Sequence, residues 1–441
     1  MNFQIEMSNK IMHFNHLPEI VQKYLARNKE FVRTPYETNG KLYDLVVVIP
    51  ALAEFENSKK LLKSLENNPK SEKTLVLFVV NNSTGSTNEV RTENERLIEL
   101  LDSRIGKTRQ FDLNFIDASS PGKELPDKYA GVGLARKIGM DYALTVFDYS
   151  SSSKKIIACL DADCLVEENY FRTITDNYNK LNLSAAVIDF EHQIPNDSKQ
   201  HSAIVNYEIF LRYYVLGLKY ANSPYAFHTI GSTITVDYEN YVKIGGMNKK
   251  KAGEDFYFVE KLAKVTQIGR IESTKVYPSS RKSWRVPFGT GRRINRFLSR
   301  TKNEYLLYNP ESFKILRNWL KIFNSNEVWH ANDYLKRAEK IDGRLLNFLK
   351  SNNFENDWEK ILKNSRSERQ INLQKKLWFD GFRTLKLIHF LRDSGLPEIN
   401  MFDACDILFN KIDPEIKIVR NSEIPPLKIQ QKYLQTLKNL F

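Results

Sequence analysis

A short apolar run in the middle of this chain ends on two carboxylates that are one residue apart. The run is Ile156–Leu160, and the carboxylates belong to Asp161 and Asp163. A run of this length suits a buried strand and is too short for a helix, so the two acids follow the carboxyl end of a strand, where open α/β sheets bind ligands. Carboxylates at this spacing can converge on one hard cation, and Mg²⁺ or Mn²⁺ that bridges a diphosphate suits such a pair.

Strand and helix patterns alternate on both sides of this run. Continuous apolar strands separated by amphipathic helices predict a parallel, doubly wound α/β sheet whose strands are covered on both faces. Polar residues follow each of the early strands, so the sheet edge can carry chemistry. The expected strands are 45–50, 74–80, 112–116, 156–160, 185–190 and 231–236, and the expected helices are 17–28, 58–66, 88–101, 131–146 and 256–263.

The chain changes character after about residue 303, where helical periodicity dominates and strand signals are few. We expect three parts: a helical lead-in at 1–40, an α/β domain at 41–302 and a helical domain at 303–441. The basic amphipathic pattern near 375–392 is typical of a helix packed on its neighbours, with a membrane-surface helix as the alternative. The helices expected in the last part are 329–348, 357–362, 371–392 and 401–408.

Composition sets the class of protein. The 441 residues are 41% hydrophobic and 12% aromatic, which is enough to fill a core, so a disordered chain is excluded. No apolar run reaches the roughly 18 residues of a membrane span, and the first residues lack the apolar stretch of a secretory signal. Three cysteines without metal-ligand spacing favour a reducing, cytoplasmic location, with peripheral contact at the inner membrane face left open.

The formal charge of +13 is concentrated in one region, because Arg270–Lys302 contains ten bases and one acid. A local cluster favours a local anion, and we expect no nucleic-acid partner. The segments Arg281–Arg285 and Gly289–Arg293 suggest a flexible basic loop that closes over a phosphorylated ligand, since arginine binds phosphate in a bidentate manner and glycine lets the backbone approach closely. A solvated basic linker is the alternative.

Several short motifs, taken in order, resemble those of the family 2 glycosyltransferases with a GT-A fold. Each motif is weak alone, but their order and spacing are specific. The resemblance covers roughly residues 43–293 and implies a doubly wound mixed sheet, followed here by the C-terminal helical domain. The segments that carry it are 47–51 with Glu54, 78–84, 131–139, 160–164, 245–246 and 253–255. Asn82 stands where many members have an aspartate that contacts the base, so the nucleobase is left open.

The resemblance implies a metal-dependent transferase that moves a hexose from a nucleotide-diphosphate sugar to an acceptor hydroxyl. Asp163 is the expected ligand of Mn²⁺ or Mg²⁺, and Asp161 either shares the metal or holds the ribose. Asp255 is the expected general base of an inverting reaction, and its place at a helix N-terminus favours the ionised form. Glu254 either contacts the acceptor or caps the helix. The expected donor contacts are Pro50, Ala51, Glu54, Asn82, Arg136, Asp161, Arg281 and Arg285.

Three alternatives to this interpretation stay open. A retaining enzyme with similar motifs is the first, and a non-catalytic anion- or nucleic-acid-binding protein that uses the basic cluster is the second. A sugar-nucleotide pyrophosphorylase is the third, but it requires a glycine-rich basic loop where this chain has Ala51–Glu56. Two further motifs have structural interpretations. Gly131–Arg136 lacks the third glycine of a dinucleotide fingerprint and fits helix packing, and His228 is more readily structural than a metal ligand.

Overall fold

The computed structural model describes residues 17–31, 33–35, 40–282 and 289–440. It divides into two compact units, each with its own hydrophobic core. The first unit contains the described residues up to Glu191 together with Thr229–Pro278, and the second contains His192–His228 and the described residues from Ser279 onwards. The range 41–302, which we expected to be one domain, is therefore shared between the two units.

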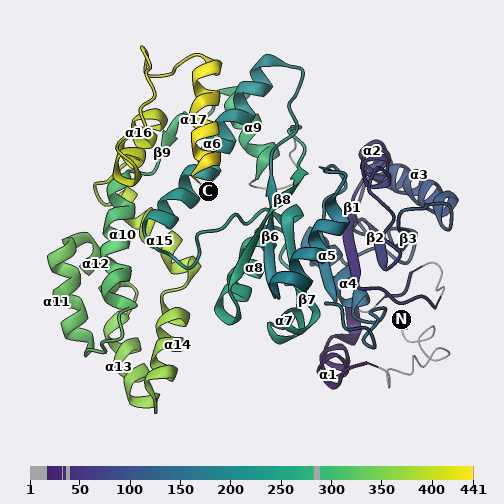
Figure 1. Ribbon diagram of the computed structural model, residues 1–441, viewed down its shortest axis with the longest axis horizontal. Coiled ribbons are helices and arrows are strands. Elements are labelled where there is room, and N and C mark those ends of the chain that lie inside the picture. The colour runs from purple at the N-terminus through teal and green to yellow at the C-terminus, as the bar shows by residue number, and fades with distance from the viewer. Residues whose placement is uncertain (1–16, 32, 36–39, 283–288, 441) are drawn as a thin grey trace. The chain divides into compact units, whose positions relative to one another are not determined.

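The first unit is built on a mixed sheet (Figure 1). Its eight described strands lie in the order β3-β2-β1-β4-β7-β6-β8-β5. Strands β3, β2, β1 and β4 are parallel, whereas β7 runs antiparallel to both β4 and β6. The α/β prediction is confirmed. The strands are β1 (Leu45–Ala51), β2 (Thr74–Asn81), β3 (Asp112–Ala118), β4 (Ile156–Cys159), β5 (Leu165–Val166), β6 (Ala185–Phe190), β7 (Ile234–Asp237) and β8 (Ile268–Tyr277).

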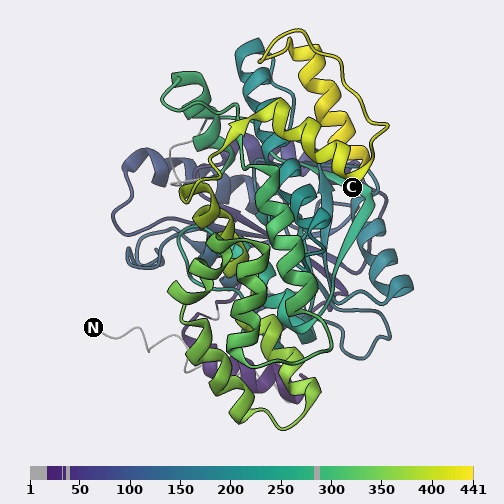
Figure 2. The same cartoon turned by 90° about the vertical axis from the view of Figure 1, so that its left-hand side faces the viewer.

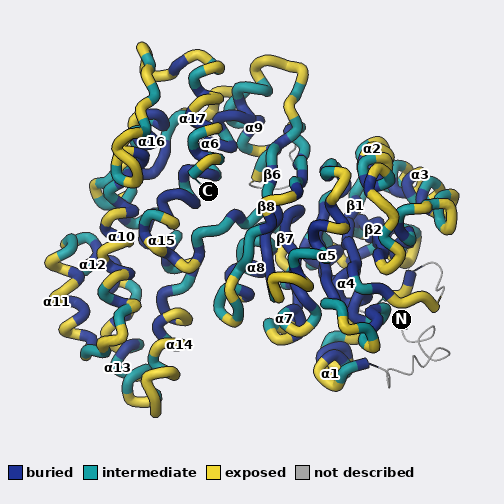
Figure 3. The backbone as a smooth tube through the Cα atoms, viewed as in Figure 1, coloured by how far each residue is buried: buried dark blue, intermediate teal, exposed yellow. Residues whose placement is uncertain are grey.

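The central strands are apolar along their whole length because both of their faces are covered. Every residue of β1 and β2 is buried (Figure 3), as expected for parallel strands between two layers of helices. The helix α4 (Val132–Ala143) packs on these strands and is itself buried from Gly133 onwards. A side chain at Gly139 would press on Val48 and Val79, so the glycine permits the close approach of α4 to the sheet.

A buried polar network fixes the N-terminal helix of the first unit to its neighbours. Asp141 of α4 accepts hydrogen bonds from the hydroxyls of Tyr24 and Tyr241, at 2.7 and 2.6 Å. Lys137 pairs with the same carboxylate at 2.8 Å and donates to the Tyr24 hydroxyl. The remaining helices of this unit are α1 (Glu19–Asn28), α2 (Phe55–Glu66), α3 (Asn88–Arg104), α5 (Tyr170–Leu181), α7 (Tyr238–Lys243) and α8 (Glu254–Val265).

The second unit is mainly helical, as Figure 2 shows from the side on which α10 to α13 (green) face the viewer. Its core is rich in aromatic side chains, and the rings of Trp319 and Phe323 stack with centroids 4.9 Å apart. Its helices are α6 (Ser198–Tyr220), α9 (Thr290–Ser299), α10 (Pro310–Phe323), α11 (Ala331–Ile341), α12 (Gly343–Ser351), α13 (Phe354–Asn364), α14 (Glu368–Trp378), α15 (Gly381–Asp393), α16 (Met401–Ile412) and α17 (Leu427–Asn439), with the short strands β9 (Leu306–Leu307) and β10 (Ile399–Asn400).

Two helices expected to be continuous are each broken by an aspartate. The expected helix 329–348 divides into α11 and α12 at Asp342, whose side chain accepts a hydrogen bond from the backbone of Arg344 at 2.8 Å. The expected helix 371–392 divides at Asp380, which caps α15 through the backbone of Arg383 at 2.9 Å. Aspartate favours such N-cap positions because its carboxylate accepts from the unpaired amides of a first turn. None of the described helices has both the length and the apolar character to span a membrane.

Candidate active site

Four loops begin side by side at one edge of the sheet of the first unit. The register pairs Ala51 of β1 with Val80 of β2, and Asn81 of β2 with Ala118 of β3. On the other side of β1, β4 is also parallel, so its carboxyl end reaches the same edge. Ligands of open α/β sheets bind at such an edge. The edge carries the predicted site residues Pro50, Ala51, Glu54, Asn82, Asp161 and Asp163.

The buried amide of Asn94, in α3, holds the loops after β1 and β2 together. Its Oδ1 accepts from the backbone nitrogen of Ala53 at 2.9 Å, and its Nδ2 donates to the backbone oxygen of Asn81 at 3.1 Å and to Oδ1 of Asn82 at 2.9 Å. Asn82 in turn donates to the backbone oxygen of Ser83. The Asn82 amide is therefore engaged within the protein, and its predicted contact with a nucleobase stays a prediction.

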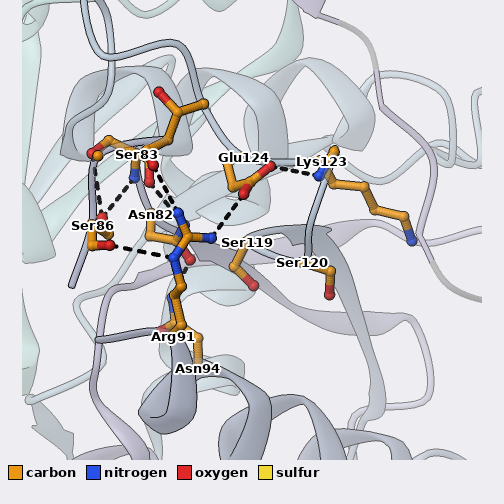
Figure 4. Close-up of polar contacts among 12 residues, drawn as sticks. Asn82, Ser83, Ser86, Arg91, Asn94, Ser119, Ser120, Lys123 and Glu124 are labelled. Carbon is orange, nitrogen blue, oxygen red and sulfur yellow. Dashed lines mark hydrogen bonds and ion pairs between the residues drawn. The ribbon is translucent and has the colours of Figure 1, made fainter. Parts of the chain in front are cut away.

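A second residue of α3, Arg91, joins the loops after β2 and β3 (Figure 4). Its guanidinium donates to the backbone oxygens of Thr84 and Ser86, at 2.7 and 3.3 Å, and pairs with Glu124 at 2.8 Å. The other oxygen of Glu124 accepts from the backbone of Gly122 at 2.7 Å. Both loops are thus fixed by one side chain. No local sequence pattern marks Arg91 or Asn94, because each acts on segments distant in the sequence.

The carboxylates of Asp161 and Asp163 lie in the turn after β4, and both residues are half-buried. The described residues contain no group of three or more His, Cys, Asp or Glu side chains placed to hold a metal. The pair Asp161 and Asp163 suits Mg²⁺ or Mn²⁺, which are commonly held by one or two carboxylates together with substrate phosphates and water. Asp163 and Asp161 are the residues that would hold such an ion.

Arg136 of α4 connects this turn to the start of α8. It is 2% exposed. Its Nη2 donates to Oδ1 of Asp161 at 2.5 Å, and its Nη1 donates to Oε1 of Glu254. Glu254 is also buried, and its carboxylate takes part in this ion pair, so the two roles predicted for it stay predictions. Both terminal nitrogens of Arg136 donate to protein carboxylates, and the predicted contact of Arg136 with a donor stays a prediction.

Asp255 follows Glu254 in the first turn of α8, and its Oδ1 accepts from the backbone nitrogen of Phe256 at 2.7 Å. Burial and the neighbouring Glu254 charge raise the pKa of Asp255 from 3.8 to about 7, with a further contribution from Asp161, although Arg136 and the Phe256 amide oppose them. The prediction that the helix dipole keeps this pKa low is wrong, because burial and two nearby carboxylates outweigh the dipole. A carboxyl group with this pKa is well matched to proton transfer near neutral pH.

Two glycines, Gly133 and Gly246, allow neighbouring segments to approach closely. A side chain at Gly133 would come within 2.9 Å of the backbone oxygen of Asn248 and 3.1 Å of the Glu254 side chain. This confirms that the Gly131–Arg136 motif serves helix packing. Gly246 has φ +73°, and a side chain there would overlap the Tyr24 hydroxyl. Gly246 therefore permits a close contact with Tyr24 of α1, whereas a side chain at Gly245 would meet no atom within 4 Å.

Four further residues considered in the sequence are Glu54, His228, Arg281 and Arg285. Glu54 is buried at the start of α2 and accepts from Nδ2 of Asn57 at 2.6 Å. His228 is buried at the end of the second unit's first segment. Arg281 lies in the second unit, and Arg285 falls outside the described residues. The roles predicted for Arg281 and Arg285 toward a donor stay predictions.

The described part of the basic cluster contains a strand and a helix, whereas residues 283–288 of the predicted basic loop lie outside the described residues, so that loop stays a prediction. Arg270 and Lys275 lie in β8, and Arg293 and Arg296 lie in α9. Most of these bases pair with carboxylates from outside the cluster, which the count of charges along the sequence did not reveal. The pairs are Arg270–Asp189 at 3.1 Å, Lys275–Glu191 at 2.6 Å, Arg293–Glu304 at 2.8 Å, Arg296–Glu304 at 2.7 Å and Lys302–Glu398 at 3.7 Å.

The helices α14 and α15, for which a membrane-surface role was the alternative, contribute most of their apolar residues to the core of the second unit. Trp378, Leu387, Ile388 and Leu391 are buried there. Exposed apolar side chains remain at Leu373, Leu377 and Phe382. Ordinary packing thus accounts for the pattern near 375–392, and contact with a membrane stays a prediction.

The sequence matches no family model and no curated protein. Solved structures that it resembles at low TM-scores include S. aureus TarS 1–349, with 12% identity, a TM-score of 0.38 and coverage of 80% of this chain and 92% of that chain. The same TarS segment in complex with UDP-GlcNAc has 11% identity and a TM-score of 0.40, and the match covers 80% of this chain and 92% of that chain. The mannosyltransferase PcManGT from Pyrobaculum calidifontis, in complex with GDP-Man and Mn²⁺, has 12% identity and a TM-score of 0.35. This match covers 96% of this chain and 92% of that chain. TM-scores of 0.40 and lower assign no family, so the functional argument rests on the site.

Proposed function

We propose that the first unit transfers a hexose from a nucleotide-diphosphate sugar to an acceptor hydroxyl. In this proposal Asp163 and Asp161 hold Mn²⁺ or Mg²⁺, and Asp255 is the general base of an inverting reaction. The loops after β1 and β2, with Pro50, Ala51, Glu54 and Asn82, receive the nucleotide.

One observation carries the proposal. The guanidinium of Arg136 pairs with Asp161 at 2.5 Å and with Glu254, the residue before Asp255. The turn suited to a divalent metal and the carboxyl group with a pKa of about 7 therefore belong to one connected set of charges. Strongly shifted pKa values at such a sheet edge are typical of functional sites.

The proposed step is a displacement at the anomeric carbon of the sugar. The acceptor oxygen forms a bond to this carbon as the bond from the carbon to the diphosphate oxygen breaks, and the diphosphate leaves with the electron pair. Asp255 takes the proton of the acceptor hydroxyl. With a pKa of about 7 it is a much stronger base than an ordinary aspartate, and such a match to the working pH favours proton transfer. A bound divalent ion would supply positive charge for the leaving diphosphate.

The test is release of nucleoside diphosphate from candidate donors by the full chain. UDP-GlcNAc and GDP-mannose with Mn²⁺ are the first donors to assay, with water or simple sugars as acceptors. We expect release that EDTA abolishes and that Asp163→Asn lowers strongly. Binding of UDP or GDP in the presence of Mn²⁺ is measured in parallel by calorimetry.

The outcomes separate the alternatives. If the product has the donor's anomeric configuration, the proposed donor site would stand, but Asp255 could not be the base of an inverting reaction. Absence of both release and nucleotide binding for every donor would contradict the proposal. Tight binding of duplex DNA that weakens steeply with salt would instead favour a nucleic-acid-binding protein.

A further inference from the structure

We propose that Arg136 is a positioning residue that couples the two halves of the site, and that Gly231 is required because its backbone forms the seat of the Arg136 guanidinium. The inference rests on the proposed function, because that function identifies the two parts that Arg136 positions: the metal-binding turn and the helix that carries the base. The coupling itself is a physical property of the first unit and can be measured without any activity.

The Arg136 guanidinium contacts two separate segments of the first unit. Nη2 donates to Asp161 in the turn after β4, and Nη1 donates to Glu254 at the start of α8. These two segments are 93 residues apart in the sequence (161 to 254) and belong to different elements. The strand pairings that flank the turn, β4 with β7 and β5 with β8, do not include the start of α8, so the guanidinium is a direct bridge between the two segments.

The backbone of Gly231 lies against the guanidinium of Arg136. An added Cβ at Gly231 would lie within 2.7 Å of Nη1, Nη2 and Cζ of Arg136, and these are the three atoms nearest to it. The backbone at Gly231, at the start of the 3-10 turn Gly231–Thr233, thus lies directly against the guanidinium. Gly231 is not among the glycines with positive φ, so an alanine there requires no left-handed backbone, and the three atoms nearest to its Cβ belong to the Arg136 guanidinium.

The positive charge of Arg136 balances the negative charges of the carboxylates around it. Arg136 is 2% exposed and faces two carboxylates, with Asp255 as a third nearby. Loss of one partner from a buried ion pair is strongly destabilising because a charge remains without compensation. Without the guanidinium, the carboxylates would repel one another, and the turn after β4 and the first turn of α8 would move apart. A lysine cannot replace the arginine, because one ammonium group lacks the planar fork that reaches two carboxylates in fixed directions.

Hydrogen exchange tests the coupling directly. The variants are Gly231→Ala and Arg136→Met, and the segments observed are 160–164 and 254–258. We expect exchange in both segments to become faster by about tenfold or more in both variants, while exchange in β1 and β2 stays unchanged. If either segment keeps its wild-type exchange when the other loosens, the coupling is wrong.

Matched controls use features of the same kind elsewhere. Gly343→Ala adds a Cβ at a position with no atom within 4 Å and should leave both segments unchanged. Arg420→Met removes an arginine that also pairs with two carboxylates, Asp403 and Asp406, in the second unit, and it should not affect them either. Because Arg136→Met leaves carboxylates unpaired and could unfold the unit, Gly231→Ala keeps the test decisive.

A double variant distinguishes the proposed seat from an unrelated effect of the alanine. If Gly231→Ala acts through the guanidinium, it should add almost nothing to exchange in the Arg136→Met background, because substitutions at residues in contact are not additive. Full additivity would overturn the role assigned to Gly231.

Kinetics then separate positioning from donor contact. In an active enzyme, Gly231→Ala should lower kcat by about 10- to 100-fold while the KM for donor changes less than about threefold, since misplacement of reacting groups affects the transition state. A rise in KM alone would place Arg136 in the donor site and contradict the inference. Coupled exchange without activity toward any sugar nucleotide would instead leave the inference intact and remove the proposed function.

Discussion

Asp255 is the residue whose chemistry differs most from that of its type in solution. Its pKa is raised to about 7, chiefly by burial and then by the Glu254 charge. The group is therefore protonated in the folded protein at pH values where an unfolded aspartate, with its pKa of 3.8, is ionised. The folded state loses stability as the pH rises from about 4 through about 7, which is the sign expected for a raised carboxyl pKa. Such a cost in stability is typical of residues retained for function.

The first prediction is that Asp255→Asn lowers transfer and stabilises the fold. Transfer should fall by about 10²-fold or more, since positioned proton transfer contributes about 10²–10⁴. In the wild-type protein, kcat should decline as the pH falls below about 7, and this limb should vanish in the variant. At pH 8 the variant should unfold at a higher temperature, because a buried charge next to Glu254 is removed. Initial rates and thermal unfolding across pH 5–9 check both parts.

A lower unfolding temperature for Asp255→Asn at pH 8, together with undiminished transfer, would make Asp255 a structural helix residue. Asp176→Asn is the control, since Asp176 makes only surface ion pairs with Arg172 and Lys180 on α5. This substitution should change neither quantity.

The second prediction concerns the metal. Asp163→Asn should weaken binding of Mn²⁺ in the presence of UDP or GDP by about 10-fold or more, because a charged ligand is lost and few protein ligands remain to replace it. Binding of the metal is measured by calorimetry, and circular dichroism checks the fold. Equal affinity in a folded variant would exclude Asp163 as a ligand.

At the scale of elements, α3 shapes the loops of the sheet edge. Asn94 satisfies three polar groups of the loops after β1 and β2, and Arg91 fixes the loop after β3 through Glu124. Ala53 has φ +50°, a left-handed conformation that alanine rarely adopts. The hydrogen bond from its backbone to Asn94 helps to retain this conformation.

The third prediction is that Asn94→Ala destabilises the first unit by about 2–4 kcal/mol, because each buried polar group left without a partner costs about 1–3 kcal/mol. Nucleotide binding should weaken as well, since Ala53 and Asn82 lose their common partner. Denaturant unfolding and calorimetry with UDP or GDP and Mn²⁺ measure the two effects. Glu95→Ala, an exposed change on the same helix, should leave both within error, and an equal loss in this control would refute the role of Asn94.

At the scale of the whole molecule, the second unit has a buried charge cluster of its own. Glu208 of α6 accepts from the backbone and from the ring of His192, at 2.6 and 3.0 Å, and pairs with Arg212 at 3.5 Å. Burial alone would raise the pKa of Glu208, but the His192 hydrogen bonds and the charges of His192 and Arg212 lower it from 4.5 to about 2. The cluster joins the beginning of the unit's first segment to its long helix.

The fourth prediction follows from the sign of this shift. A lowered carboxyl pKa contributes stability that is complete above about pH 4.5 and is lost as the pH falls toward about 2. The free energy of unfolding of the second unit should therefore fall by about 3 kcal/mol between these pH values. This figure follows from the size of the pKa shift at about 1.36 kcal/mol per pKa unit. Glu208→Gln should flatten this dependence and lower stability at pH 7.

Tryptophan fluorescence measures this unfolding, because Trp319, Trp329, Trp358 and Trp378 all belong to the second unit. Glu355→Gln, at an exposed position of α13, is the control and should keep the wild-type profile. An identical pH profile in Glu208→Gln would show that Glu208 does not carry the acid sensitivity.

The sequence determined the elements of this protein and the identity of its acidic motifs. Apolar runs such as Leu45–Pro50 and Ile156–Leu160 predicted the strands, and the position of Asp161 and Asp163 after a strand placed them at the sheet edge, because strand period and burial are short-range properties. Only the tertiary structure decided which charges meet. Arg136 lies between Asp161 and Glu254, and Glu304 neutralises two arginines of the basic cluster. Those contacts, and the raised pKa of Asp255, depend on burial and on distances between segments far apart in the chain, which no local pattern encodes.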